Sequence, residues 1–187
     1  MSAPLKKLKL FAGIALEKRV QQQLFKVAER LRARGLDGRF EAVEKYHLTV
    51  AFLGWIEPTE LTPLAGAMQA VAERFHPFRL RFDRIAGFPH ERRPRVVWIG
   101  CHKQPAAYNE LTRSLQTAYA EFGFSFKDDP VAHVTIARIK AARRPLPSID
   151  AFEPIDAGVN ALTLFESLPA GGTTRYEARA QAPLSGA

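Results

Sequence analysis

The chain has 187 residues, enough for one ordinary domain or for two small lobes that share a core. Hydrophobic residues make up 47% of the chain, which argues against a disordered protein. With 27 basic and 19 acidic side chains the formal net charge is +8, and a basic surface favours polyanionic partners such as nucleic acid or phosphate esters. The one cysteine, Cys101, cannot form an internal disulfide, so the sequence predicts a protein of the reducing cytoplasm.

The N-terminal pattern predicts a first strand over residues 8–16. Basic Lys6, Lys7 and Lys9 precede the apolar run 10–16, as in a secretory leader, but the run is short and the charged residues 17–19 follow it at once. No stretch of the sequence approaches the length of a transmembrane helix, so we expect no membrane partner.

The remaining elements are predicted from the spacing of apolar residues and from Gly and Pro positions. In chain order after the first strand, we expect a helix at 17–34, a strand at 46–56, a helix that opens at Pro58, strands at 78–86 and 95–100, a helix at 104–122, a strand at 131–138, and an antiparallel pair at 158–167 and 174–182. Basic loops are expected at 87–94 and 141–147. Strands and helices mix without strict alternation, which indicates an α+β fold with antiparallel sheets.

A short internal repeat is the most informative feature of the sequence. The segment His47-Leu48-Thr49-Val50-Ala51 matches His133-Val134-Thr135-Ile136-Ala137 identically or by conservative changes. Both copies lie on predicted strands, where alternate side chains share a face. Each copy therefore presents an imidazole and a hydroxyl side by side, with its aliphatic residues directed into the core.

Two such strands meet the needs of phosphodiester cleavage. One imidazole takes a proton from water, the other gives a proton to the leaving oxygen, and the hydroxyls of Thr49 and Thr135 donate hydrogen bonds to the phosphoryl oxygens. The sequence has no paired cysteines and no His-Glu-x-x-His motif, so we expect neither a metal nor another cofactor. The residues alone do not decide which histidine is the acid.

The paired His-x-Thr motifs resemble those of the 2H phosphoesterases, and within them the bacterial RNA 2',3'-cyclic phosphodiesterase family, also called 2'-5' RNA ligases. The similarity extends to residues 9–14, 46–54, 93–100 and 133–138, and to the C-terminal segment 164–177. One departure is Ala132, where the family usually has proline before the second histidine.

This resemblance implies one domain over residues 1–187, built as a bilobal α+β fold in which two pseudo-symmetric antiparallel sheets with outer helices face a central cleft. It also implies that His47 is the proton donor and His133 the proton acceptor in hydrolysis of RNA 2',3'-cyclic phosphate ends to 2'-phosphates. The expected partner is RNA with such an end, or a cyclic nucleotide, and the expected state is a monomer.

Two further residues are candidates for substrate binding. Arg138 follows the second motif, but strand alternation directs it away from His133 unless the strand ends or bulges there. Tyr46 precedes His47 and either stacks on a base or packs in the core.

Other activities remain open on the sequence alone. The same site suits 2'-5' RNA ligation or cleavage of 2'-5' linkages, and the scaffold suits a non-catalytic RNA- or nucleotide-binding module. Retention of both histidines and both threonines favours an enzyme, because binding alone needs no pair of proton-transfer groups.

Overall fold

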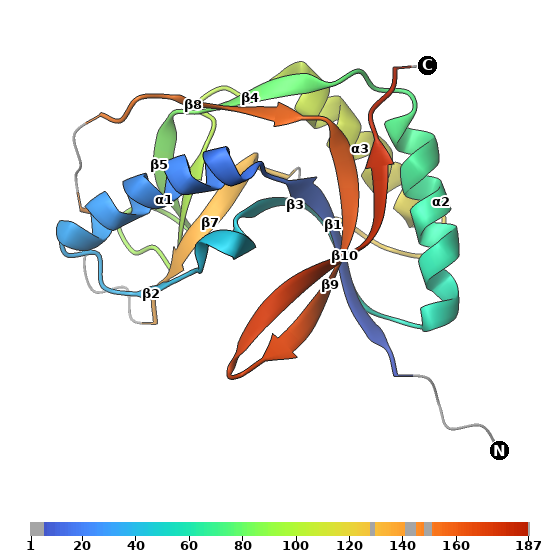
Figure 1. Ribbon diagram of the computed structural model, residues 1–187, viewed down its shortest axis with the longest axis horizontal. Coiled ribbons are helices and arrows are strands. Elements are labelled where there is room, and N and C mark those ends of the chain that lie inside the picture. The colour runs from blue at the N-terminus through green and yellow to red at the C-terminus, as the bar shows by residue number, and fades with distance from the viewer. Residues whose placement is uncertain (1–5, 128–129, 141–144, 148–150, 187) are drawn as a thin grey trace.

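The computed structural model describes residues 6–127, 130–140, 145–147 and 151–186 (Figure 1). The described helices are α1 (Lys18–Ala33), α2 (Leu61–Ala72) and α3 (Ala106–Ala120), with short 3-10 turns at Val43–Lys45 and Pro58–Glu60. The described strands are β1 (Leu8–Ala15), β2 (Arg39–Phe40), β3 (His47–Ile56), β4 (Phe78–Phe82), β5 (Arg84–Phe88), β6 (Val96–Gly100), β7 (His133–Arg138), β8 (Ile155–Val159), β9 (Ala161–Ala170) and β10 (Thr173–Pro183).

Two four-stranded antiparallel sheets form the framework of two lobes. The first sheet has the strand order β10-β9-β1-β3 and the second the order β2-β7-β6-β5, while β4 and β8 form a separate two-stranded sheet. The units β1-α1-β3 and β6-α3-β7 are alike, because in each a helix follows one strand and the chain returns to pair antiparallel with that strand. The expected bilobal α+β fold with antiparallel sheets is confirmed.

The helices bury the apolar stripes that their sequences predict. In α1 the buried residues are Val20, Leu24, Val27, Ala28 and Leu31, and Gly35, with φ of 87°, ends the helix in the left-handed conformation that glycine adopts without strain. Figure 1 places α1 on the side of the second sheet, whereas α2 packs against α3, β9 and β10. None of the described helices is long and apolar enough to cross a membrane.

The spacing of Leu111, Leu115, Ala118 and Phe122 predicts the buried stripe of α3, and the structure agrees with it in part. Leu111 and Leu115 are buried, and Ala118 packs partly buried against the core. The large buried rings are instead Tyr108 and Tyr119, while Phe122 lies beyond the helix end and is 39% exposed.

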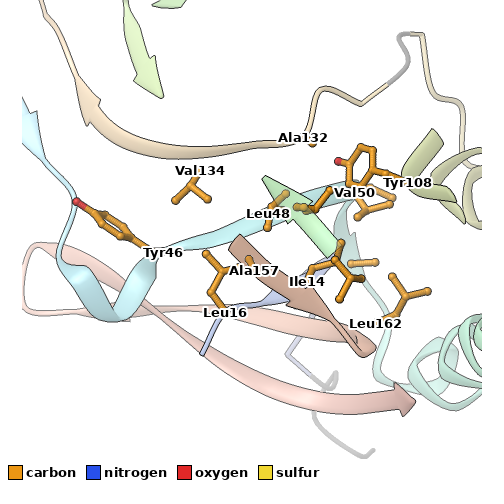
Figure 2. Close-up of a cluster of buried hydrophobic side chains, with 14 of the residues drawn as sticks. Ile14, Leu16, Tyr46, Leu48, Val50, Tyr108, Ala132, Val134, Ala157 and Leu162 are labelled. Carbon is orange, nitrogen blue, oxygen red and sulfur yellow. The ribbon is translucent and has the colours of Figure 1, made fainter. Parts of the chain in front are cut away.

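One core connects the two lobes behind the predicted site. Leu48 and Val50 of β3 lie in the same buried cluster as Val134 of β7, together with Tyr108 of α3 and Leu162 of β9 (Figure 2). Leu48, Val50 and Val134 alternate along their strands with the histidines and threonines of the two motifs. The burial of one face of β3 and β7 therefore fixes the direction of the polar face.

The strand predicted at 78–86 is wrong as one element. The chain changes sheets at Asp83, so that β4 pairs with β8 and β5 pairs with β6. Asp83 accepts a hydrogen bond from the backbone N–H of His102 at 2.7 Å and donates its own N–H to Gly100 at 3.0 Å. These bonds hold the switch point, where the apolar alternation of Phe78, Leu80 and Phe82 breaks at Arg84. The short strands β2 and β8 were also not predicted.

Candidate active site

The two His-x-Thr motifs lie where the sequence predicts them, at the starts of β3 and β7. His47, Thr49, His133 and Thr135 are each half-buried, while Leu48, Val50, Val134 and Ile136 between them are buried. The strand alternation expected from the repeat is therefore confirmed for these residues. β3 and β7 also contact each other, which brings the two motifs to one region of the molecule.

Both imidazoles make the same bond to the backbone two residues earlier. Nδ1 of His47 lies 2.6 Å from the carbonyl oxygen of Lys45, and Nδ1 of His133 lies 2.7 Å from that of Val131. Because a carbonyl oxygen only accepts, each Nδ1 carries the hydrogen. In each neutral ring the lone pair therefore sits on Nε2, the atom at which a proton can be gained or given up.

Thr49 is coupled directly to the first imidazole. Its Oγ1 lies 2.9 Å from Nε2 of His47. When the ring is neutral, Nε2 accepts the hydroxyl hydrogen, and when the ring is protonated, Nε2 can no longer accept it. Protonation of His47 thus frees the hydroxyl of Thr49 to donate to another acceptor in the site.

Burial lowers the pKa of both histidines below the ordinary value for imidazole. For His47 the backbone bond to Lys45 opposes this effect and the charge of His133 adds to it. For His133 the bond to Val131 opposes it and the charge of Arg138 adds to it. Both rings are therefore neutral at neutral pH in the free protein.

A bulge at the same place in each motif reorients the residue that follows. The pairing skips Val50 in β3, where Ala12 faces Ala51 and Gly13 faces Thr49. It likewise skips Ile136 in β7, where Val97 faces Ala137 and Trp98 faces Thr135. Each bulge places two successive residues in the core, so the strand resumes with its alternation reversed.

The bulge in β7 decides the orientation of Arg138. Ile136 and Ala137 are both buried, so Arg138 is exposed on the face that carries His133 and Thr135. Simple alternation would direct Arg138 to the other face, but the bulge, which the sequence analysis named as the exception, reverses that direction. Its Nε donates to Oε1 of Glu41 at 3.0 Å, which holds the guanidinium near the cleft.

Glu41 links the surroundings of the two motifs. Besides Arg138 it binds Nζ of Lys45 at 3.0 Å, and Lys45 in turn reaches Oγ1 of Thr173 at 3.1 Å and lies over the ring of Tyr176. Burial alone would raise the pKa of Glu41, but the hydrogen bonds from Lys45 and Arg138 lower it below the usual range. The carboxylate is therefore ionised and bridges a residue before His47 and a residue after His133.

Aromatic rings surround both histidines, and the sequence analysis did not identify them. Phe11, Phe165 and Tyr176 lie 4.9, 5.8 and 5.0 Å from the ring of His47 between centroids. Phe88 and Trp98 lie 5.1 and 5.7 Å from that of His133. These rings come from strands distant in sequence, so only strand order and register bring them to the site. Their apolar surfaces account for the desolvation of both imidazoles.

An open pocket of about 960 Å³ adjoins His133 through Phe88 and Trp98. Arg84, Arg92 and Arg93 also line it, so the basic loop expected at 87–94 contributes two arginines to this pocket. In the second basic loop, expected at 141–147, Arg143 and Arg144 lie outside the described residues.

Tyr46 does not take the base-stacking role considered from the sequence. It is 1% exposed and lies in the core cluster, where burial raises the pKa of its phenol (Figure 2). Its position directly before His47 places it on the face opposite the histidine. The core alternative is correct, and the prediction of substrate binding is wrong.

Cys101 is not a nucleophile at neutral pH. It is buried, and burial raises the pKa of its thiol to about 11, so the thiol stays protonated. In the part of the chain that the structure describes, no three His, Cys, Asp or Glu residues gather closely enough to hold a metal ion.

Comparison with known proteins agrees with this site and fold. Residues 14–98 match the family model of the LigT-like phosphoesterases. A protein of Archaeoglobus fulgidus named RNA 2',3'-cyclic phosphodiesterase is 30% identical over 138 residues, which cover 71% of this chain and 73% of that protein. One of the same name from Geobacillus stearothermophilus is 37% identical over 77% of this chain, but this chain spans only about half of it, 47%.

Solved structures support the same assignment. Escherichia coli LigT in complex with 3'-AMP superposes with a TM-score of 0.82 at 26% identity, covering 96% of this chain and 99% of that one. A protein of Thermus thermophilus superposes with a TM-score of 0.80 at 24% identity, which bears on the fold. The fold and the paired motifs define a two-histidine phosphoesterase. The chain belongs to the LigT-like phosphoesterase family.

Proposed function

We propose that this protein hydrolyses RNA 2',3'-cyclic phosphate ends to 2'-phosphomonoesters, with His47 as proton donor and His133 as proton acceptor. The observation that carries the proposal is the pair of imidazoles in matching motifs, each with Nδ1 bonded to a backbone carbonyl and therefore with its titrating lone pair on Nε2. The names of the curated relatives supply the substrate class, and the 3'-AMP complex of Escherichia coli LigT supports a nucleotide ligand.

The proposed reaction is an in-line displacement at phosphorus. Nε2 of His133 takes a proton from water as the water oxygen bonds to phosphorus on one side. The bond from phosphorus to the 3'-oxygen breaks on the other side, and Nε2–H of His47 delivers its proton to that oxygen. Because nothing in the paired motifs distinguishes the two roles, their direction follows the family resemblance.

The threonines bind the non-bridging oxygens in this proposal. Protonation of His47 releases the hydroxyl hydrogen of Thr49, which then points to a phosphoryl oxygen instead of Nε2. Thr135 occupies the equivalent position in the second motif and donates in the same way. Arg138, held by Glu41 on the face of His133, adds a positive charge beside the phosphate.

We also propose that residues 1–187 form one catalytic domain of two similar lobes that acts as a monomer, because both motifs come from a single chain. The reaction is proposed to need no metal. The cytoplasm, where the single buried thiol of Cys101 needs no disulfide partner, remains the predicted compartment.

The proposal is tested on three RNA substrates in parallel. One ends in a 2',3'-cyclic phosphate, one contains an internal 2'-5' linkage, and one is a cyclic-phosphate RNA mixed with an RNA that bears a 5'-hydroxyl. We expect fast conversion of the first to a phosphomonoester that phosphatase removes. Faster cleavage of the 2'-5' linkage, faster joining of the mixed RNAs, or intact binding of the cyclic end would contradict the assignment.

A further inference from the structure

Two large aromatic side chains stand exposed on the strand that carries the first motif. Phe52 is 74% and Trp55 63% exposed, and both belong to β3, downstream of His47 and Thr49. Among the described residues, the only other exposed large hydrophobic side chain is Phe122, and it is 39% exposed. Two neighbouring exposed rings on one strand form an apolar surface of the kind that marks an interaction site.

Phe52 and Trp55 lie on the same face as the catalytic residues. In the pairing of β1 with β3, Phe52 is opposite Phe11 and Trp55 is opposite Lys9. Lys9 and Phe11 are two residues apart on β1 and so share a face. The ring of Phe11 contacts both His47, at 4.9 Å, and Phe52, at 6.1 Å. Phe52 and Trp55 therefore form a row of exposed rings that begins beside the candidate active site.

A positively charged side chain, Lys9, lies beside this row of rings. Nζ of Lys9 lies 5.9 Å from the centroid of the Trp55 ring. Lys9 is itself exposed, so its ammonium group is available to a phosphate while it stays beside the ring. Aromatic faces with a nearby cation are the usual means by which proteins hold single-stranded nucleic acid without reading its sequence.

We propose that Lys9, Phe52 and Trp55 form a stacking track for the single-stranded RNA that precedes the cyclic phosphate. The inference rests on the proposed function, which places the 3'-oxygen, and with it the ribose, on the side of His47. The chain upstream of that ribose then meets the first lobe, where the row begins. The pocket at Phe88 and Trp98 lies on the opposite side, from which water attacks.

The track implies a preference for RNA over mononucleotides. From His47 to Trp55 an extended strand spans roughly 25 Å, and the bulges shorten this only in part. A mononucleotide at the two histidines does not reach the far end of such a row. Bases upstream of the terminal nucleotide do, and each stacks on a ring regardless of its identity.

Equilibrium binding separates this inference from the proposed activity, because a product RNA binds without turnover. The ligands are a fluorescent RNA tetranucleotide that ends in a 2'-phosphate, and 2'-AMP. For the double variant Phe52→Ala, Trp55→Ala we expect the Kd for the tetranucleotide to rise at least about tenfold and the Kd for 2'-AMP to stay unchanged. Phe122→Ala truncates an exposed ring away from this strand and should leave both values as in the wild type.

Lys9→Gln provides a second readout. If Lys9 contacts one phosphate, the slope of log Kd against log salt for the tetranucleotide should become shallower by about 0.7. An unchanged tetranucleotide Kd in the double variant, or equal losses for both ligands, would overturn the track. A wild-type dimer that dissociates in the double variant, seen by sedimentation, would assign the row to a second copy of the chain instead.

Discussion

At the scale of single residues, each histidine owes its tautomer to its own strand. The bond from Nδ1 to the carbonyl two residues earlier needs only the backbone that leads into the motif, at Lys45 for His47 and at Val131 for His133. The replacement of the family's usual proline by Ala132 leaves this arrangement intact, since the carbonyl of Val131 still accepts. The chemistry is therefore encoded locally, and the strand pairing supplies the second half of the site.

Each histidine should be individually essential. Loss of a general acid or base costs about a hundredfold to ten-thousandfold, so His47→Ala and His133→Ala should each lower kcat by at least that amount. Thr49→Val and Thr135→Val should cost less, and the matching serine variants, which keep the hydroxyl, should retain most activity. Circular dichroism controls for folding. Near-normal turnover in either folded histidine variant would contradict the assigned roles.

The pH profile of kcat/KM should be a bell with its maximum below about pH 6.5, the ordinary histidine value. The active form needs His47 protonated and His133 neutral. Burial lowers the pKa of both, so His133 stays neutral further into acid and His47 loses its proton earlier as pH rises. Both limbs therefore shift to lower pH. Initial rates at low substrate concentration measure the profile, and a rise that continues into alkaline pH would contradict it.

At the scale of elements, the site depends on close approach of β1 to β3. Gly13 faces Thr49 in this pairing, and a Cβ at Gly13 would overlap the carbonyl oxygen of Leu48. The absence of a side chain at Gly13 leaves space for the bulge at Val50. This bulge sets the direction of the β3 side chains that follow it. The requirement is for space, since Gly13 does not have a positive φ.

Gly13→Ala should therefore lower the free energy of unfolding by about 1–3 kcal/mol, the usual cost of overpacking. Gly66 offers the matched control, because it lies inside α2 and an added Cβ there meets nothing within 4 Å. Gly66→Ala should stabilise the protein by about 0.4–1 kcal/mol. Urea unfolding of both variants measures the difference. Equal stabilities would show that β1 yields to the extra methyl group.

The elements also show what the sequence can predict of this fold. The repeat identified both His-x-Thr strands and their buried faces, because an alternation of polar and aliphatic residues carries that information directly. It could not place the bulges at Val50 and Ile136, which depend on the partner strand, and so it left the direction of Arg138 open. The aromatic rings of Phe11 and Tyr176 were not predicted for a similar reason, since each comes to lie beside His47 only through the order of strands in the sheet.

At the scale of the whole molecule, two equivalent half-sites meet across one shared core. The aliphatic residues between the histidines and threonines of the motifs, such as Leu48 and Val134, join a single buried cluster. Glu41 adds a polar link, since it binds Lys45 beside the first motif and Arg138 beside the second. Packing and charge thus set the separation of the two imidazoles together, and no further group is required to hold them.

Activity should survive removal of metal ions. In the proposed reaction two imidazoles supply both proton transfers, and two hydroxyls and the Arg138 guanidinium bind the phosphoryl oxygens. Turnover after prolonged dialysis against EDTA should therefore equal that of the untreated protein, with metal content checked by atomic emission. A loss that one divalent ion restores, and that others do not, would contradict the mechanism.

The position of the phosphate in the product tests the central claim most directly. A dinucleotide 2',3'-cyclic phosphate can open toward either ribose oxygen, and phosphorus NMR distinguishes the two monoesters. With His47 beside the 3'-oxygen and His133 beside the attacking water, the protein should yield only the 2'-phosphate, and the double variant His47→Ala, His133→Ala should yield neither. A 3'-phosphate would contradict the assigned roles of the two histidines, and a mixture would show that the site does not orient the ring.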